Sequence, residues 1–366
     1  TFIPLKKYEA TELKEQFKVG YQGVPGSFSN QAMKSWFGDI EGINYPHFED
    51  VYKALEKGDI DYGVLPLENS STGAINDNYD LLTKYGFYIV GEQSITIDQN
   101  LLGIKGATLE DIKDVYSHVQ GLKQTSEFLT AHHIEGHEYL NTAAAAKYIS
   151  EAQDKTIGAI ASSEAAKLYN LDIIAKAIQN DQSNHTRFII IARQYEIRPS
   201  ANRISMVFTV NHEVGALYEV MRVVKEHNIN MARIESRPLP LSPWEYYFYL
   251  DIDGNLNQDH VQRALQEIKT YTNTFRMIGN YERNIVLIGI MGSGKTTFGH
   301  MLSQITGHEM IDLDDYLVNR FNMSIPDMFA ISEDYFRNNE TLCCKEVSEL
   351  EGKIISTGGG VIKRPE

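Results

Sequence analysis

Short apolar stretches alternate with helical stretches along the first half of the chain, and this alternation constrains the fold more than any other feature. FKVGYQ and RFIIIAR are examples of the strand-like runs. The stretches between such runs, for example TAAAAKYISEA, have helical composition. Strands that alternate with helices predict an α/β layered fold, with ligands at the carboxyl ends of the strands. We predict that this first domain spans residues 17–193.

Two further domains are predicted after it. QYEIRPSANR has the composition of a linker, because proline and serine interrupt any helix there. Residues 202–282 then show the order strand, helix, strand, strand, helix, strand, which predicts a ferredoxin-like α+β sandwich. A third domain is predicted over residues 284–366. Residues 1–16 are predicted to form an N-terminal tail, and the first residue, a threonine, suggests a piece of a longer polypeptide.

Composition places the chain among globular proteins and narrows its partners. Its 366 residues are 42% hydrophobic and 23% charged, which fits two or three domains. The formal net charge of −15 repels phosphate backbones and argues against a nucleic-acid partner. The sequence has no apolar run of membrane-spanning length and no basic and apolar leader. We therefore expect a cytoplasmic protein without membrane association.

Cysteine and histidine usage argues against disulfides and metal sites. The two cysteines, Cys343 and Cys344, are adjacent, and a bond between neighbours would close a strained ring. The eleven histidines show no spacing typical of metal ligands. We expect neither a disulfide nor a thiolate metal site.

Polar residues gather where strands of the first domain give way to turns or helices. Hydroxyls and backbone N–H groups at such positions can surround an anion. Arg187 is the one strong cation in these patches, and its guanidinium suits a carboxylate. Each Ser, Thr or Asn taken alone could equally be a helix cap, whereas the set together favours a binding site. The patches are residues 27–29, 68–70, 117–118, 141–142 and 184–188.

Six motifs of the first domain occur in an order and spacing that closely resemble the prephenate dehydratase family. This family converts prephenate to phenylpyruvate in phenylalanine biosynthesis, without a metal or cofactor. The resemblance implies a two-lobed fold like that of periplasmic binding proteins. The chain departs from the family pattern at Val119, where proline is usual, and at Asn141, where serine is common; we interpret His118 as structural. The motifs are GYQGVPGSFSNQA, VLPLENSSTG, SHVQ, NTAAAAKY, AIASSEAAKLYNL and NHTRFIII.

The same resemblance implies roles for individual residues. Thr186 would assist the departing hydroxyl, and Arg187 would bind a substrate carboxylate. Phe188 has an alternative interpretation as a core aromatic residue. The predicted catalytic residues are Thr186, Arg187, Glu68, Asn69, Ser117 and Gln124. The predicted substrate-binding residues are Ser27, Ser29, Ser70, Asn141, Thr142 and Phe188.

The second domain contains two motifs, VGAL and ESRP, that resemble those of the ACT domain found after prephenate dehydratases. In that family the domain binds phenylalanine at an interface between subunits, which implies feedback regulation and a homo-oligomer, either a dimer or a tetramer. A glycine at a helix N-terminus lets the backbone approach a carboxylate closely. Val214 replaces a frequent proline. The predicted regulatory residues are Gly215, Ala216, Leu217, Glu235, Ser236 and Arg237.

GIMGSGKT in the third domain fits the phosphate-binding pattern G-x-x-x-x-G-K-[ST]. It follows the apolar strand IVLI and precedes a helical run, which is the context this loop requires. Backbone amides would hold the phosphates of ATP, and Thr296 would hold Mg²⁺. The predicted ATP-binding residues are Gly292, Ser293, Gly294, Lys295, Thr296 and Thr297.

MIDLDDYL, SIPDMF, FRNNE and STGGGVI extend this to a resemblance with shikimate kinase. The resemblance places Asp312 near the metal. The family continues after the triple glycine with a lid arginine and an adenine-contacting loop, and Arg364 is too early to serve as the lid arginine. We therefore expect an incomplete kinase with exposed apolar surface and no shikimate phosphorylation by this chain. The predicted shikimate-binding residues are Asp314, Arg337, Gly358, Gly359 and Gly360.

Other interpretations of the whole chain remain open at this point. The full-length protein could be a bifunctional dehydratase and shikimate kinase, with or without an upstream chorismate mutase. A solute-binding protein would share the two-lobed architecture, but it would need an export signal and no sensor domain. A kinase regulated by its front portion would need the missing lid. We favour a phenylalanine-regulated prephenate dehydratase.

Overall fold

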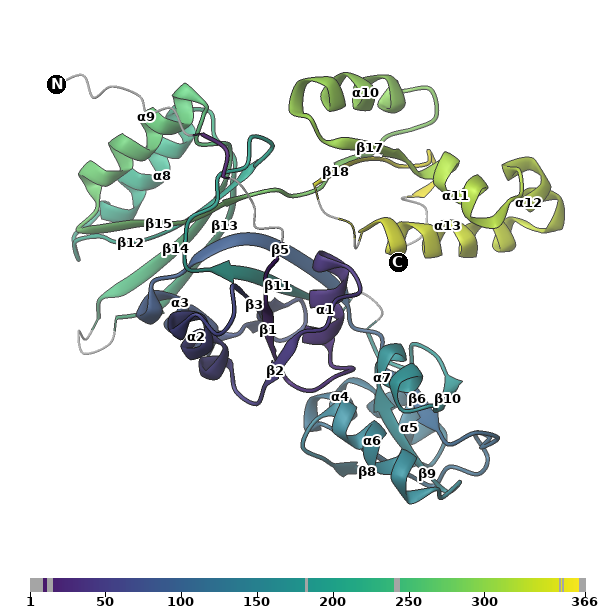
Figure 1. Ribbon diagram of the computed structural model, residues 1–366. Coiled ribbons are helices and arrows are strands. Elements are labelled where there is room, and N and C mark those ends of the chain that lie inside the picture. The colour runs from purple at the N-terminus through teal and green to yellow at the C-terminus, as the bar shows by residue number, and fades with distance from the viewer. Residues whose placement is uncertain are drawn as a thin grey trace. The chain divides into compact units, whose positions relative to one another are not determined.

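The computed structural model describes residues 9–11, 16–181, 184–239, 244–348, 350 and 352–361 (Figure 1). Most of the predicted tail at residues 1–16 lies outside the described residues, as does the end of the third domain after residue 361. Within the described ranges, no helix is both long enough and apolar enough to cross a membrane.

The chain divides into two compact units, which differ from the predicted domains in their boundaries. The first unit comprises Lys18–Leu81 and Gln93–Phe188. The second comprises Leu82–Glu92 and Ile189–Pro365, together with the N-terminal residues. The segment Leu82–Glu92 of the predicted first domain therefore clusters with the residues of the ferredoxin-like domain.

One half of the first unit is a small parallel sheet covered by helices. Strands β3, β1 and β2 lie side by side in that order, and β4 pairs with the end of β3. Helices α1 and α2 pack against β1 and β3. Residues 62–67 of β3 are buried throughout, so that Asn69 stands at the end of a buried strand. The elements are β1 (Val19–Gln22), α1 (Phe28–Phe37), β2 (Ile43–Tyr45), α2 (Phe48–Lys57), β3 (Tyr62–Asn69), β4 (Gly73–Ala74) and the start of α3 (Asn76–Tyr85).

The other half is a mixed five-stranded sheet with the order β10-β6-β9-β7-β8. Helix α6 packs against β9 and β7, and its fully buried Ala143, Ala145 and Ala146 allow a close approach. The stretch LKQTSEFLTAH is not one continuous helix: two short helices meet at Thr125, whose hydroxyl donates to the carbonyl of Gly121 at 2.8 Å. The elements are β6 (Asn100–Gly103), β7 (Asp114–Ser117), α4 (Val119–Gln124), α5 (Ser126–Ala131), β8 (Glu135–Glu138), α6 (Thr142–Ala152), β9 (Ile157–Ala161), α7 (Ser163–Leu168) and β10 (Asp172–Ala175).

Two chain segments connect these halves. The first follows β5 (Tyr88–Thr96), and the second leads into β11 (His185–Ala192). Backbone hydrogen bonds hold the segments to each other: the Ile97 N–H donates to Asn184 and the Ile178 N–H donates to Gln99, both at 2.8 Å. These bonds hold the backbone between β5 and β6 against the segment before β11.

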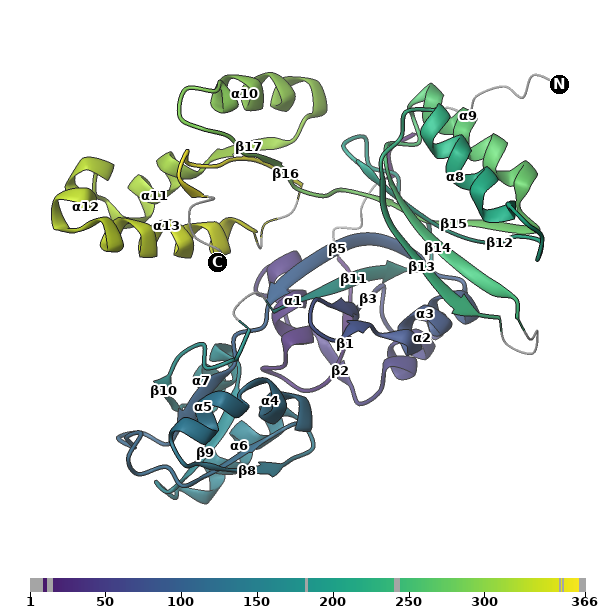
Figure 2. The ribbon, with the colours of Figure 1, turned by 180° about the vertical axis from the view of Figure 1, so that it is seen from behind.

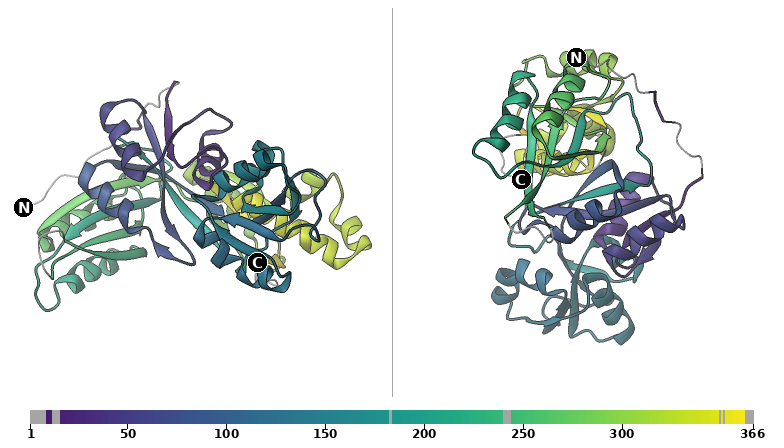
Figure 3. Two further views of the ribbon diagram at one scale, coloured as in Figure 1. Left: turned by 90° about the horizontal axis from the view of Figure 1, so that it is seen from below. Right: turned by 90° about the vertical axis from the view of Figure 1, so that its left-hand side faces the viewer.

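The second unit contains an antiparallel sheet with the order β13-β14-β12-β15, beside which β5 pairs in parallel at Ile89 and Gly279. Helices α8 and α9 lie side by side on one face of this sheet (Figures 1 and 2, and the right panel of Figure 3). Their apolar faces pack with Ile204 and Leu250 of the strands in one core. The elements are β12 (Arg203–Thr209), α8 (Ala216–Glu226), β13 (Met231–Pro238), β14 (Tyr246–Asp253), α9 (Asp259–Ile268) and β15 (Thr274–Tyr281).

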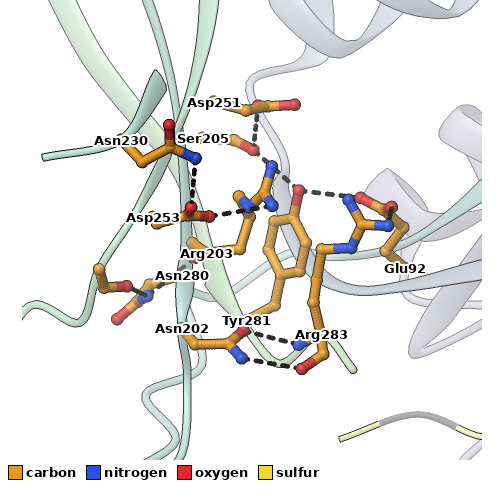
Figure 4. A network of polar contacts seen from close by, with 11 residues as sticks. Glu92, Asn202, Arg203, Ser205, Asn230, Asp251, Asp253, Asn280, Tyr281 and Arg283 are labelled. Carbon is orange, nitrogen blue, oxygen red and sulfur yellow. Dashed lines mark hydrogen bonds and ion pairs between the residues drawn. The ribbon is translucent and has the colours of Figure 1, made fainter. Parts of the chain in front are cut away.

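A buried polar network joins β15 to β5 within the second unit (Figure 4). The Tyr281 hydroxyl donates to the Glu92 carboxylate at 3.1 Å and lies 3.0 Å from the Ser205 hydroxyl. Ser205 donates to Asp251 at 2.5 Å, and the Arg283 guanidinium lies 3.3 Å from Glu92. Because Glu92 is only 1% exposed, these partners compensate for the burial of its carboxylate.

The chain after Asn284 forms a three-stranded parallel sheet with the order β16-β18-β17. Several large apolar side chains around its first helix are exposed, including Met291 at 87% and Ile305 at 78%. The elements are β16 (Ile285–Leu287), α10 (Lys295–Thr306), β17 (Glu309–Asp312), α11 (Leu313–Phe321), α12 (Ile325–Ile331), α13 (Glu333–Ser348) and β18 (Lys353–Ser356).

Both cysteines lie on α13 and are free. Burial raises the pKa of Cys343 to about 11 and that of Cys344 to about 12. Both thiols are therefore protonated near neutral pH, which makes them weak nucleophiles.

Removal of the Tyr281 hydroxyl should destabilise the second unit. Tyr281→Phe leaves the buried Glu92 carboxylate with one fewer donor, so we expect the free energy of unfolding to fall by about 1–3 kcal/mol. Urea denaturation followed by circular dichroism measures the change. Tyr271→Phe is the matched control, because the Tyr271 hydroxyl binds Arg222 at an exposed surface and its loss should change the unfolding free energy by less than about 0.5 kcal/mol. Equal effects of the two substitutions would contradict the role given to the bond between Tyr281 and Glu92.

Candidate active site

A cavity of about 420 Å³ lies in the first unit, which is a size suited to a small organic ligand. Its walls come from the ends of β1, β3 and β11, the first turns of α1, α4 and α6, and the segment after β5. None of its lining residues in the described chain is Asp, Glu, Lys or Arg. The predicted site residues that line it are Ser27, Ser29, Asn69, Gln124, Asn141, Thr142, Thr186 and Phe188.

Helices α1 and α6 begin at this cavity with capped N-termini. The Ser27 hydroxyl caps α1 by accepting from the Asn30 N–H at 3.3 Å. The side-chain oxygen of Asn141 caps α6 by accepting from the Ala144 N–H at 2.7 Å. The two alternatives left by the sequence, a helix cap or a cavity residue, therefore both hold for Ser27 and Asn141. The positive ends of the two helix dipoles favour an anion at this position.

Asn69 and Thr186 meet at the wall of the cavity, and both are more than nine-tenths buried. The Asn69 Nδ2 group donates to the Thr186 hydroxyl oxygen at 2.9 Å and to the Asn184 side-chain oxygen at 2.7 Å. The Asn69 Oδ1 atom accepts from the Ser71 and Thr72 N–H groups at 3.0 and 3.1 Å, which fixes the orientation of the amide. Because the Thr186 oxygen accepts from Asn69, the hydroxyl proton can be donated into the cavity.

Arg187 and Glu68 are not among the residues that line the cavity. Side chains alternate along a strand, so Thr186 and Phe188 share the face of β11 that Arg187 does not occupy. The Arg187 Nε atom lies 3.7 Å from the Glu68 carboxylate, and its side chain is 13% exposed. The structure thus brings the two residues together beside the cavity wall.

Ser117 and Ser70 also have structural partners outside the lining. Ser117 is fully buried, and its hydroxyl donates to the Ile160 carbonyl at 2.8 Å. The Ser70 hydroxyl accepts from the His185 N–H at 2.9 Å, and the Ser70 N–H donates to the His185 carbonyl at 2.8 Å. Ser70 thereby fastens the end of β3 to the start of β11.

The predicted regulatory residues lie on two elements of the second unit. Gly215 precedes α8 with φ +87°, a conformation that favours glycine, and Ala216 and Leu217 form the first turn of α8. The other three, Glu235, Ser236 and Arg237, lie on β13, which is at the edge of the sheet. Val214 is fully exposed beside Gly215.

The predicted nucleotide loop precedes α10. Gly292 and Gly294 have φ of +76° and +83°, and Ser293 lies between them. The Thr296 hydroxyl donates to Asp312 at 2.8 Å, which joins the two predicted Mg²⁺ ligands. The Lys295 ammonium donates to the Gly289 carbonyl at 2.9 Å, and Thr297 follows in the same turn of α10.

The predicted shikimate residues also lie together. A Cβ atom on Gly358 would lie 2.9 Å from an Asp314 carboxylate oxygen, and one on Gly360 would lie 2.5 Å from the Arg337 guanidinium. A Cβ atom on Gly359 would lie 2.8 Å from the backbone nitrogen of Met291 in the nucleotide loop. Burial, reinforced by neighbouring carboxylates, raises the pKa of Asp314.

Comparisons with known proteins match two parts of the chain, the one that contains the cavity and the one that contains the nucleotide loop. Residues 19–196 match the family model for prephenate dehydratase, and residues 291–366 match that for shikimate kinase. The bifunctional chorismate mutase/prephenate dehydratase of Enterobacter agglomerans is 35% identical over 278 residues, which cover 74% of this chain and 72% of that protein. The chain belongs to the prephenate dehydratase family.

Other members of the family broaden the comparison. An arogenate dehydratase/prephenate dehydratase of Arabidopsis thaliana is 35% identical and covers 76% of this chain and 77% of its own. The solved prephenate dehydratases of Staphylococcus aureus and of Arthrobacter aurescens, the latter in complex with L-Phe, both superpose with a TM-score of 0.65. They are 28% and 25% identical, each covers 72% of this chain, and the match spans 99% and 89% of their own chains. A structure described as a quorum-quenching acylase, GqqA, is similar to the same degree, with a TM-score of 0.67 and 29% identity over 72% of this chain and 97% of its own.

Several residues that line the dehydratase cavity were missed in the sequence. Gln22 is the last residue of β1 and Gln99 follows β5, and this position at a strand end was the available signal. His118, interpreted above as structural, both caps α4 through its Nδ1 atom and lines the cavity. Gln120, in the next turn, also lines it.

A small cluster outside the cavity has metal-ligand geometry that the residue spacing did not suggest. Asp114, Glu135 and His137 place their ligand atoms within 4.8 Å of one another on β7 and β8. The His137 Nε2 atom and the Asp114 carboxylate already form a contact of 2.7 Å, which accounts for the approach of the two side chains.

We expect this chain to phosphorylate shikimate no faster than a loop-disabled variant. The two arginines in the described part of the kinase segment, Arg320 and Arg337, are paired with glutamates, so neither is available to stabilise the transferred phosphoryl group alongside Lys295 and Mg²⁺. A coupled ADP-release assay with ATP and shikimate compares the parent with Lys295→Ala. Turnover of the parent clearly above that of Lys295→Ala would contradict this expectation.

Proposed function

We propose that the cavity of the first unit binds prephenate and converts it to phenylpyruvate. The bond between the ring and its carboxylate breaks to release CO₂, and the electron pair of that bond enters the ring. The C4 hydroxyl leaves with the electron pair of its own bond and, with one proton from solvent, becomes water. Formation of an aromatic ring drives the reaction, so the enzyme has to hold two carboxylates, assist the departing oxygen and exclude bulk water. We expect no metal or redox cofactor in these steps.

The contact between Asn69 and Thr186 carries this proposal. Since Asn69 donates to the Thr186 oxygen at 2.9 Å, the Thr186 proton is directed to another acceptor. We assign that acceptor to the C4 oxygen of prephenate. A threonine hydroxyl is too weak an acid to give up its proton outright, so its contribution is a hydrogen bond that strengthens as negative charge develops on the leaving oxygen.

Uncharged donors are the proposed ligands of the carboxylates. The N-termini of α1 and α6, the Ser29 hydroxyl and the Gln124 amide all belong to the cavity. Arg187 was expected to bind a carboxylate, but it lies against Glu68 and outside the lining. We propose that this ion pair affects the reaction indirectly, through the positions of its chain neighbours. Glu68 precedes Asn69, and Arg187 follows Thr186.

Removal of the Thr186 hydroxyl should abolish most of the dehydratase activity. Thr186→Val keeps the shape of the side chain but provides no donor, and we expect kcat to fall by about 100-fold or more, as for the loss of other oxyanion donors. Phenylpyruvate formation is followed by its ultraviolet absorbance with prephenate as substrate.

Thr186→Ser is the matched control and should retain activity within about tenfold, because it keeps the hydroxyl. A parent protein inactive on prephenate would refute the proposal, and arogenate, named for several relatives, is the alternative substrate for the same assay. Equal activity of parent and Thr186→Val would refute the role of the hydroxyl.

We also propose that residues 202–282 form an ACT domain that binds phenylalanine as a feedback inhibitor. Gly215 and the first turn of α8 would receive the carboxylate, and Glu235 would meet the ammonium group. The Arthrobacter aurescens prephenate dehydratase, which was solved in complex with L-Phe, supports the choice of this ligand. The edge position of β13 supports assembly of two or more copies through this sheet.

Gly215→Ala should weaken the response to phenylalanine and spare the basal activity. At φ +87° an alanine is strained, and its methyl group would occupy the space beside the amides of α8. We expect the inhibition constant for phenylalanine to rise at least about tenfold, which corresponds to about 1.4 kcal/mol. Gly307→Ala, at φ +77° with equally open surroundings after α10, is the matched control and should leave the inhibition constant unchanged. Activity of the parent that saturating phenylalanine does not alter would refute the sensor.

For the kinase segment we propose that ATP and Mg²⁺ are the ligands. Thr296 and Asp312 are already hydrogen-bonded in a way that suits one Mg²⁺ between them. The Lys295 ammonium would exchange its loop carbonyl for phosphate oxygens.

A further inference from the structure

Gln99 is a buried amide at the cavity to which no role has been given so far. It lies in the segment between β5 and β6, is 3% exposed, and lines the cavity. A polar side chain so deeply buried is normally kept there by specific hydrogen bonds.

The contacts of Gln99 lead directly to Gln124. The Gln99 Nε2 group donates to the Gln124 side-chain oxygen at 3.2 Å. The main chain of Gln99 is held on both sides, since its N–H donates to the Gln179 side-chain oxygen at 3.0 Å and its carbonyl accepts from the Ile178 N–H at 2.8 Å. The Gln179 amide in turn donates to Asp98 at 3.1 Å. Gln99 is thus anchored before it reaches Gln124.

The orientation of the Gln124 amide follows from this contact. Its oxygen faces the Gln99 NH₂ group, so its own NH₂ group is left for the cavity, where Gln124 is also a lining residue. The reverse orientation of both amides would leave the Gln99 NH₂ group unpaired, whereas the observed one leaves the Gln99 Oε1 atom without a partner among the described residues. A buried oxygen without a partner is tolerated better than a buried N–H group without one.

We propose that Gln99 is a positioning residue that presents the Gln124 NH₂ group to a carboxylate of the substrate. A cavity that holds a dianion with no Lys or Arg among the lining residues that the structure describes depends on the direction in which each amide points. If the Gln124 amide turned over, it would replace a donor with an oxygen that repels the anion. This inference deepens the proposed dehydratase function and rests on it.

A double-mutant cycle tests the proposal in the full chain. Gln99→Met removes the donor and leaves the Gln124 amide free to turn, so we expect kcat/KM for prephenate to fall about tenfold or more, mainly through a higher KM. In the background of Gln124→Met, the same Gln99→Met change should lower kcat/KM by less than about twofold. Gln99→Asn retains an amide but is one methylene shorter, so it should show the same pattern and serves if Gln99→Met does not fold.

Gln262→Met is the matched control, because it removes a buried amide of the second unit that donates to the Leu256 carbonyl and is not among the residues that line the cavity. We expect it to lower the melting temperature but to leave KM within about twofold of the parent. Losses from Gln99→Met that are the same in both backgrounds would show a merely structural role and overturn the proposal. Activity of the parent with the expected loss in Thr186→Val would then leave the dehydratase function standing, so that the two failures are distinguishable.

Discussion

The geometry of the proposed catalytic site depends on the hydrogen bonds of the Asn69 side-chain amide. Its NH₂ group binds Thr186 and Asn184, and its oxygen binds the backbone of Ser71 and Thr72. An amide supplies donors and an acceptor in one plane, whereas a carboxylate or an aliphatic side chain of this size supplies only part of that set. Asn69 therefore holds the end of β3, the turn after it and the start of β11 together, alongside the bonds between Ser70 and His185, and it orients the Thr186 hydroxyl.

A neutral cavity in an acidic chain determines how an anion can be bound. With a net charge of −15 and no Lys or Arg among the described lining residues, we expect attraction to come from dipoles: helix N-termini, hydroxyls and amides. Dipoles work only when they are oriented, and the caps at Ser27 and Asn141 and the contact between Gln99 and Gln124 provide that orientation. Such preorganised donors stabilise developing charge without reorganisation during the reaction.

Strand β5 connects the proposed sensor to the cavity through the covalent chain. Glu92 on β5 is bound by Tyr281 and Arg283 of the second unit (Figure 4), and the same strand leads within a few residues to Ile97 and Gln99 of the cavity lining. A buried carboxylate held by these partners resists displacement, because loss of either one would leave a buried negative charge that is not fully compensated. A ligand that moved β15 would therefore act on β5 through this contact.

The sequence by itself determined the alternation of strands and helices, the family and eight of the residues that line the cavity, because polar residues at the ends of buried strands and in the first turns of helices occupy positions that local periodicity fixes. Thr186, Asn69 and Asn141 were found in this way. Tertiary structure alone decided that Arg187 pairs with Glu68, that Ser117 binds a backbone carbonyl, and that Gln99 orients Gln124. These partners are distant in the chain, and which way a side chain points depends on the packing of strands and crossing segments, which no local pattern contains.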